Sequence, residues 1–121
     1  YMQAPGTVRD DFSYAPWAWI FYCHMTDHQR NAVKSKITIQ DFDKKFQQWE
    51  KFYRTNNYCF DAEYILGHIR RIAAPVFDNN GKVIAAIAIG GNKFSMPDEN
   101  VDGIGRKLVS AAERLSSIIN R

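Results

Sequence analysis

The chain has 121 residues, of which 45% are hydrophobic and 24% charged, which is enough for a single domain with an apolar core and no disulfide bridges. Its formal net charge of +3 is small and its basic residues are scattered, so the composition does not support nucleic-acid binding by this chain alone. Two cysteines cannot form a disulfide framework, no secretory signal opens the chain, and its apolar runs fall short of the roughly 20 residues of a membrane span, so we expect a cytoplasmic protein.

The first readable segment is the aromatic run PWAWIFYCHM at residues 16–25, which we expect to be helical. Pro16 suits the first position of a helix, where its missing N–H needs no partner. His24 and His28 are four residues apart, a spacing that could place two imidazoles on one helical face. Because no paired motif supplies a third ligand, we interpret them as surface histidines and expect no metal site.

A second helix is predicted from Thr38, a candidate N-cap that is followed three residues later by Asp41. Aromatic residues then recur at helical spacing, and lysines occupy the opposite face. We interpret the aromatic stripe as a core face that covers a sheet. Its members are Phe42, Phe46, Trp49 and either Phe52 or Tyr53.

Residues 69–77 and 83–89 are apolar runs separated by Asp-Asn-Asn-Gly-Lys, which predicts a β-hairpin with a type I′ turn at Asn80 and Gly81. Pro75 cannot donate a ladder hydrogen bond, so it predicts an edge strand or a bulge. The second run is apolar on both faces, which predicts that a helix covers one side and that a pocket or another layer lies on the other. Gly90 and Gly91 should end this strand and allow a close backbone approach.

The last segment predicts an amphipathic helix that runs to the end of the chain. Ser95 is a candidate N-cap, with Asp98 completing a capping-box pattern and Pro97 in the first turn. We interpret Gly103 and Gly105 as a cause of fraying in the first turns. The apolar stripe comprises Val101, Ile104, Leu108, Ala111, Ala112, Leu115 and Ile119.

The stretch around the hairpin carries a family pattern in order and spacing: Asn57, Asp61, Tyr64 and Arg71, followed by IAAPVFD at residues 72–78. It resembles the C-terminal effector-binding domain of the IclR family of bacterial transcriptional regulators, specifically over residues 57–121 and loosely before them. The family has Glu at the position of Tyr64 and Cys at the position of Arg71. Its next strand commonly ends Ser-Ile-Ser-Gly-Pro, where this chain has Ala88, Ile89, Gly90, Gly91 and Asn92.

The resemblance implies an α+β fold of the GAF or profilin-like sensory type, a twisted antiparallel sheet packed by helices and truncated at its N-terminal strands. Residues 1–121 would form a single effector-binding domain, incomplete at its N-terminus and without a DNA-binding domain. It implies binding of a small organic or aromatic acid, self-association as a homodimer or tetramer, and control of DNA binding by a separate winged helix-turn-helix domain. The resemblance implies neither an enzyme nor a cofactor.

Carried over by position, the ligand site would comprise Trp17, Asp61, Ile69, Arg71, Ala88 and Gly90. Alternation places Arg70 and Arg71 on opposite strand faces, so one of them is buried. We expect Asp61 to neutralise Arg71, because an unpaired buried charge is costly. Alternatively, Arg71 could grip the acid group of an effector whose flat apolar body rests on the indoles.

Two other functions are open to the sequence. In one, Trp17 and Trp19 fill the pocket and the domain is a ligand-free dimerisation module. In the other, the chain is a small metal-dependent or acid-base enzyme that uses Asp61, Glu63, His68, Arg70 and Arg71. We do not expect the enzyme, because catalysis needs a base held in a defined geometry and the two arginines should point apart.

Overall fold

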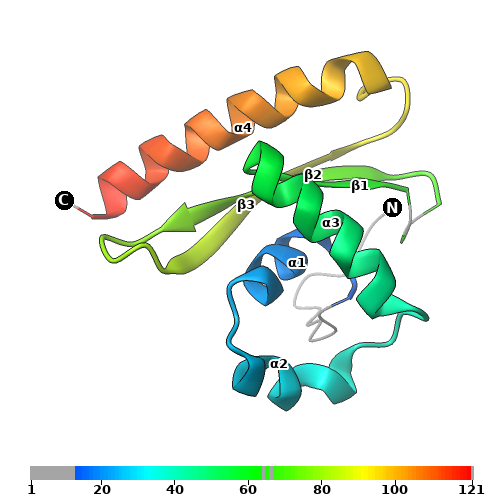
Figure 1. Ribbon diagram of the computed structural model, residues 1–121. Helices are drawn as coiled ribbons and strands as arrows, with labels where there is room; N and C mark the ends of the chain where they lie inside the picture. Colours follow the sequence, from blue (N-terminus) through cyan, green and yellow to red (C-terminus); the bar gives the residue numbers. More distant parts are fainter. Residues whose placement is uncertain (1–12, 64, 66, 121) are drawn as a thin grey trace, which may run out of the picture.

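The computed structural model describes residues 13–63, 65 and 67–120, and shows an antiparallel three-stranded sheet between two layers of helix (Figure 1). The strands lie in the order β1-β2-β3. Helix α4 crosses one face, and α1 and α3 lie against the other, so the predicted α+β class is confirmed. The elements are α1 (Pro16–Cys23), α2 (Asp27–Val33), η1 (Lys34–Lys36), α3 (Phe42–Asn56), β1 (Cys59–Ala62), β2 (Arg70–Phe77), β3 (Val83–Gly91) and α4 (Asp98–Ile119).

The predicted hairpin is confirmed, but its turn has a different geometry. Gly81 has a positive φ of 77°, whereas Asn80 is not among the positive-φ residues that a type I′ turn requires. The Gly81 N–H donates to the Asp78 carbonyl at 3.1 Å, and the Asp78 carboxylate accepts from the N–H groups of Asn80 and Lys82. The loop is therefore a tight turn over residues 78–81 with a left-handed glycine, and the Asp78 side chain fixes it.

Pro75 was predicted to lie in an edge strand or at a bulge, which is wrong for β2 as a whole and right at Pro75 itself. β2 is the central strand, but β1 pairs with it over Arg70 to Ala73 and ends before Pro75. At Pro75 the neighbouring strand is β3, and a register irregularity follows directly between Val76 and Phe77. The missing N–H therefore falls at the place where the sheet has narrowed to two strands.

Strand β3 is less covered than its apolar sequence predicted. Val83 is buried, but Ile84 and Ile89 are 42% and 45% exposed. β3 is the edge strand of the described sheet, and α4 and α1 reach it less than they reach β2. It does end at Gly91, where a side chain would meet the Ser95 Oγ at 2.6 Å, so the predicted close approach is confirmed.

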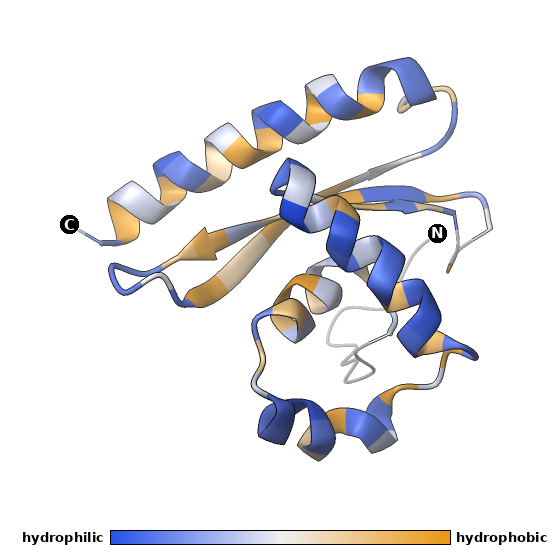
Figure 2. Ribbon diagram, viewed as in Figure 1, coloured by the Kyte–Doolittle hydropathy of each residue, from blue (hydrophilic) through white to orange (hydrophobic). Residues whose placement is uncertain are grey.

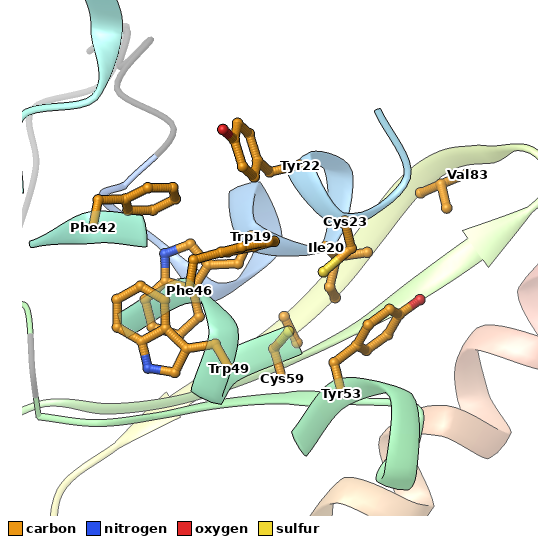
Figure 3. Close-up of a cluster of buried hydrophobic side chains, with 11 residues drawn as sticks. Trp19, Ile20, Tyr22, Cys23, Phe42, Phe46, Trp49, Tyr53, Cys59 and Val83 are labelled. Carbon is orange, nitrogen blue, oxygen red and sulfur yellow. The ribbon is translucent and has the colours of Figure 1, made fainter. Parts of the chain in front are cut away.

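The α1 and α3 face of the sheet holds an aromatic core (Figure 3). Trp19 and Trp49 stack with ring centroids 3.5 Å apart, and the Trp19 indole N–H donates to the Ser13 carbonyl. The predicted stripe of α3 is confirmed, since Phe42, Phe46, Trp49 and Tyr53 are buried. The predicted cap is wrong: α3 begins after Asp41, which has a left-handed φ of 57°, and not after Thr38.

The α4 face holds the second core, in which Ile72, Ala74 and Val76 of β2 pack against α4. Two predictions for this helix are wrong. Its N-cap is Pro97, because the Ser95 hydroxyl is engaged with Asn92 in the preceding turn. Gly105 is a packing residue and not a fraying point, because a Cβ there would lie 2.4 Å from the Tyr58 ring.

Hydrophilic residues are frequent in α2, α3 and α4, whereas α1 and most of the hairpin are apolar (Figure 2). Among residues 13–63, 65 and 67–120, the helices are too short or too polar to cross a membrane.

Candidate functional site

The most unusual buried group on the α1 face of the sheet is the guanidinium of Arg71, which is 3% exposed. Register places Arg71 opposite Asp61 on β1 and opposite Gly90 on β3. The Asp61 Oδ2 accepts from Arg71 Nη2 at 2.7 Å and from Nε at 3.2 Å, and Asp61 itself is 0% exposed. The predicted ion pair is confirmed, and the sheet register holds both of its members.

Two aromatic rings and one carbonyl complete the surroundings of this guanidinium. Arg71 Nη2 also donates to the Tyr14 carbonyl at 2.8 Å. The rings of Tyr14 and Trp17 each lie 5.3 Å from Arg71 Cζ, within the range of cation–π contacts. Arg71 Nη1 is buried and has no hydrogen-bond acceptor among the described residues. A buried donor without a partner is costly, so this nitrogen favours an acceptor brought by another molecule.

A cleft of about 430 Å³ opens beside Arg71, within the size range of small-molecule sites. Clefts of similar volume occur elsewhere on the surface, so its volume does not distinguish it. Its distinction is a mainly apolar lining with a buried arginine. We call it the Arg71 cleft, and it is lined by Trp17, Ile69, Arg71, Ala88, Ile89, Gly90, Gly91, Asn92 and Ser95.

The structure brings together five of the residues predicted for the site, namely Trp17, Ile69, Arg71, Ala88 and Gly90. Asp61 does not line the cleft and lies behind Arg71 as its counter-ion. The role of these residues in binding stays a prediction. Sequence reasoning missed Tyr14, which precedes α1 without a motif of its own, and it missed Asn92 and Ser95, which belong to one turn and line the cleft.

The two indoles that could have filled the pocket lie in different places. Trp19 is 0% exposed and is stacked in the aromatic core, away from the cleft lining (Figure 3). Trp17 is half-buried and forms a wall of the cleft. The cleft therefore remains open beside one indole.

A second buried arginine lies on the opposite face of the sheet. Arg70 is 6% exposed, donates to the Met96 carbonyl at 2.6 Å and pairs with Asp98 at the start of α4 and with Glu63 at 3.4 Å. Its Nε is buried and, like Arg71 Nη1, has no hydrogen-bond partner among the described residues, but the cleft that Arg70 lines is a separate, polar one of about 520 Å³. The residues considered for acid-base chemistry are thus divided between two faces, and His68 is exposed.

The histidine pair considered for metal binding is also divided. His24 caps the end of α1, whereas His28 belongs to α2, which starts after a capping box between Thr26 and Gln29. His24 Nε2 shares a hydrogen bond of 2.8 Å with the Tyr53 hydroxyl. The pKa of the His24 imidazole is lowered, mainly by burial and to a smaller extent by the positive charge of Arg54. Among the described residues, no cluster of three or more His, Cys, Asp or Glu side chains is placed to hold a metal.

Comparison with known proteins gives a consistent assignment of fold and family. A family profile described as the bacterial transcriptional regulator IclR C-terminal domain matches residues 25–117. The chain is similar to the Agobacterium tumefaciens repressor BlcR, with a TM-score of 0.74 and 19% identity over 88% of this chain and 46% of that one. It thus spans less than half of that repressor. A comparison with curated protein sequences finds no match.

Two solved domains are similar over a larger share of their length. The C-terminal domain of the E. coli regulator KdgR gives a TM-score of 0.73 at 20% identity, over 88% of this chain and 69% of that one. The inducer-binding domain of PobR from Acinetobacter, a double mutant in complex with 3-hydroxybenzoic acid, gives 0.72 at 19% identity, over 87% and 66%. At these identities the likeness establishes the fold.

Proposed function

The chain belongs to the IclR family of bacterial transcriptional regulators, to whose C-terminal domain it corresponds, and on this premise we propose that the Arg71 cleft binds a small aromatic effector. The observation that carries the proposal is the buried Arg71 Nη1, a donor without an acceptor beside an apolar cleft. An effector acceptor atom would satisfy this donor, and a flat ring would rest against the Trp17 indole.

The size and chemistry of the cleft support a molecule of one ring. Its volume of about 430 Å³ exceeds that of a monocyclic aromatic compound. Ala88 and Gly90 provide little side-chain bulk on the β3 side, where hydroxyl-bearing residues are common in the family. PobR, which has the same fold, was solved with 3-hydroxybenzoic acid, and we extend the single aromatic ring of that ligand to this chain.

In the complete regulator, we propose that effector binding changes how DNA-binding domains outside this chain sit on their operator. Such coupling requires that the effector bind one arrangement of the regulator better than another. Self-association of the domain as a dimer or tetramer would bring two or more of the DNA-binding domains together. The exposed apolar side chains of β3 and α4, among them Ile84 and Ile118, are compatible with such association.

The ligand-free dimerisation module remains as the second candidate function. It rests on the position of Trp17, which covers Arg71 at 5.3 Å and already provides a cation–π contact. In that case Arg71 would be a structural residue, and the cleft would take no ligand.

A thermal-shift titration with benzoate, 3-hydroxybenzoate, benzamide and the ring-free pyruvate tests the proposal. We expect at least one aromatic compound to raise the unfolding temperature of the wild-type protein saturably, because a ligand that binds the native state stabilises it. Arg71→Ala should abolish this response. Arg70→Ala is the matched control, since it removes a buried, paired arginine from the same strand but from the other face.

Tryptophan fluorescence provides a second measurement that does not depend on the stability of the variants. Binding beside Trp17 should quench or shift the emission, and Trp17→Phe should remove that change while the stacked Trp19 and Trp49 still report on the core. No thermal shift and no change of emission with any compound would favour the dimerisation module. A shift that survives Arg71→Ala would contradict the assignment of the site.

A further inference from the structure

We infer that the Arg71 cleft selects uncharged aromatic carbonyl compounds, such as amides or aldehydes, over the corresponding carboxylates. This inference rests on the proposed function of the cleft and reverses the acid that the sequence led us to expect. It follows from the charge balance of the site, from the number of donors left at Arg71 and from the polar groups around them.

The charge of Arg71 is already balanced before any ligand binds. Asp61 contacts it at 2.7 Å, and the two side chains are 3% and 0% exposed, so the pair is shielded from water. Among the described residues that line the cleft, one has a charged side chain, and it is Arg71. A carboxylate would therefore lose its hydration and add a negative charge near Asp61, which is unfavourable in an apolar environment. A neutral carbonyl oxygen has a smaller desolvation cost and adds no negative charge near Asp61.

The number of donors also fits a carbonyl better than a carboxylate. A carboxylate is bound most strongly by two parallel N–H groups of one guanidinium. Here Nε and Nη2 both donate to the same oxygen of Asp61, and Nη2 donates again to the Tyr14 carbonyl. Nη1 is the nitrogen left without an acceptor, which suits a single oxygen atom.

The other polar groups near the cleft offer fewer donors than a typical anion site. α1 begins with Pro16, so its first turn lacks one of its N–H groups. The Asn92 side-chain oxygen Oδ1 accepts from the N–H groups of Phe94 and Ser95, and the Ser95 hydroxyl oxygen accepts from the Asn92 N–H. These groups stabilise their own turn, so they give a carboxylate little compensation for the water it loses.

The test compares benzamide with benzoate, which share a ring and differ in charge at neutral pH. We expect wild-type protein to bind benzamide about tenfold more tightly by titration calorimetry, a modest difference in binding free energy. Asp61→Asn removes the negative charge and keeps an acceptor for Arg71, so it should reverse the order of the two compounds. Asp43→Asn, an exposed position on α3, is the matched control and should leave the order unchanged.

The outcomes separate this inference from the proposed function. Tighter binding of benzoate by the wild-type protein would overturn the inference and leave the Arg71 cleft as the effector site. Failure of both compounds and of benzaldehyde to bind, with unchanged tryptophan emission, would count against the cleft itself. If Asp61→Asn does not fold, the wild-type comparison between benzamide and benzoate still decides the question.

Discussion

The two faces of the central strand each bury an arginine, and they satisfy it in different ways. Arg71 is paired within the sheet to Asp61, which is 0% exposed, whereas Arg70 is paired to Asp98 and Glu63, whose side chains are 86% and 16% exposed. Arg70 ties the start of α4 to the sheet through Asp98 and the Met96 carbonyl. Arg71 is held by its neighbouring strand and lies beside an apolar cleft, whereas Arg70 lines a polar one. Each guanidinium has one buried nitrogen without a hydrogen bond among the described residues, Nη1 of Arg71 and Nε of Arg70. Neighbouring residues of one type can therefore have different roles, a structural clasp for Arg70 and, as we propose, a ligand-binding group for Arg71.

The largest expected difference between the two faces is the free energy of unfolding that is lost when each arginine is replaced. Arg71→Ala removes the arginine partner of the buried Asp61 carboxylate, and removing one partner of a buried pair costs about 3–5 kcal/mol. Arg70→Ala should cost less, about 1–3 kcal/mol, because Asp98 can regain water and charge-assisted hydrogen bonds are the main loss. Urea unfolding of the two variants measures this order. Equal losses would show that Asp61 is stabilised independently of Arg71.

A double substitution sharpens this comparison. Replacing Arg71 by Met and Asp61 by Leu removes both charges together, and buried ion pairs replaced by apolar residues are often neutral or stabilising. We expect this variant to recover most of the stability that Arg71→Ala loses and still to bind no ligand. If it is as unstable as Arg71→Ala, then the pair itself stabilises the fold. Unfolding followed by circular dichroism measures the stability of the variant, and a titration with benzamide tests whether it binds a ligand.

The α4 face offers a smaller test with its own control. A Cβ at Gly105 would lie 2.4 Å from the ring of Tyr58, which is 1% exposed, so Gly105→Ala should cost about 1–3 kcal/mol through overpacking. Gly103→Ala meets nothing within 4 Å and should stabilise the helix by about 0.5–1 kcal/mol. Opposite signs for two glycines in one helix would support the packing role. Stabilisation by Gly105→Ala would contradict it and point to fraying.

The different fates of these two glycines show what sequence could and could not predict. The hydrophobic pattern predicted the hairpin, the stripe of α3 and the amphipathic α4, because an element that buries one face has apolar residues at a characteristic spacing. It did not predict which glycine would meet Tyr58, since that contact joins residues 47 positions apart. Helix starts were missed at Thr38 and Ser95 for a related reason. Several polar residues precede each helix, and backbone geometry chooses among them.

The candidate site was also predicted only in part. Strand alternation and the family register together predicted that Arg71 would be buried with Asp61 as its counter-ion, and the two are register partners. The place of Arg70 was not predicted, because its partners come from the start of α4. The participation of the Tyr14 carbonyl was also missed, since it depends on the path of the chain before α1 and not on the type of side chain.

The smallest expected difference between the faces lies in their response to alkaline pH. On the α1 and α3 face, burial raises the pKa of the Cys23 thiol from 9.0 to about 12 and also raises the pKa of Cys59. On the α4 face, burial and a hydrogen bond to Asp102 raise the pKa of Tyr58 from 10.0 to about 12. A group whose pKa is raised by folding stabilises the protein fully below its unfolded pKa, and this stability is lost as the pH rises through the folded value.

The thiols of the α1 and α3 face should begin to lose stability near pH 9.0, and the tyrosines with raised pKa values, Tyr58 on the α4 face and Tyr22 and Tyr53 on the other, near pH 10.0. Tyr58→Phe should remove only its own share of the later part, reducing the loss of unfolding free energy by about 1 kcal/mol. Urea unfolding at closely spaced alkaline pH values measures both slopes. An unchanged profile in Tyr58→Phe would mean that the Tyr58 hydroxyl ionises as readily in the folded protein as in the unfolded chain. The α4 face would then be more open to water than the α1 and α3 face.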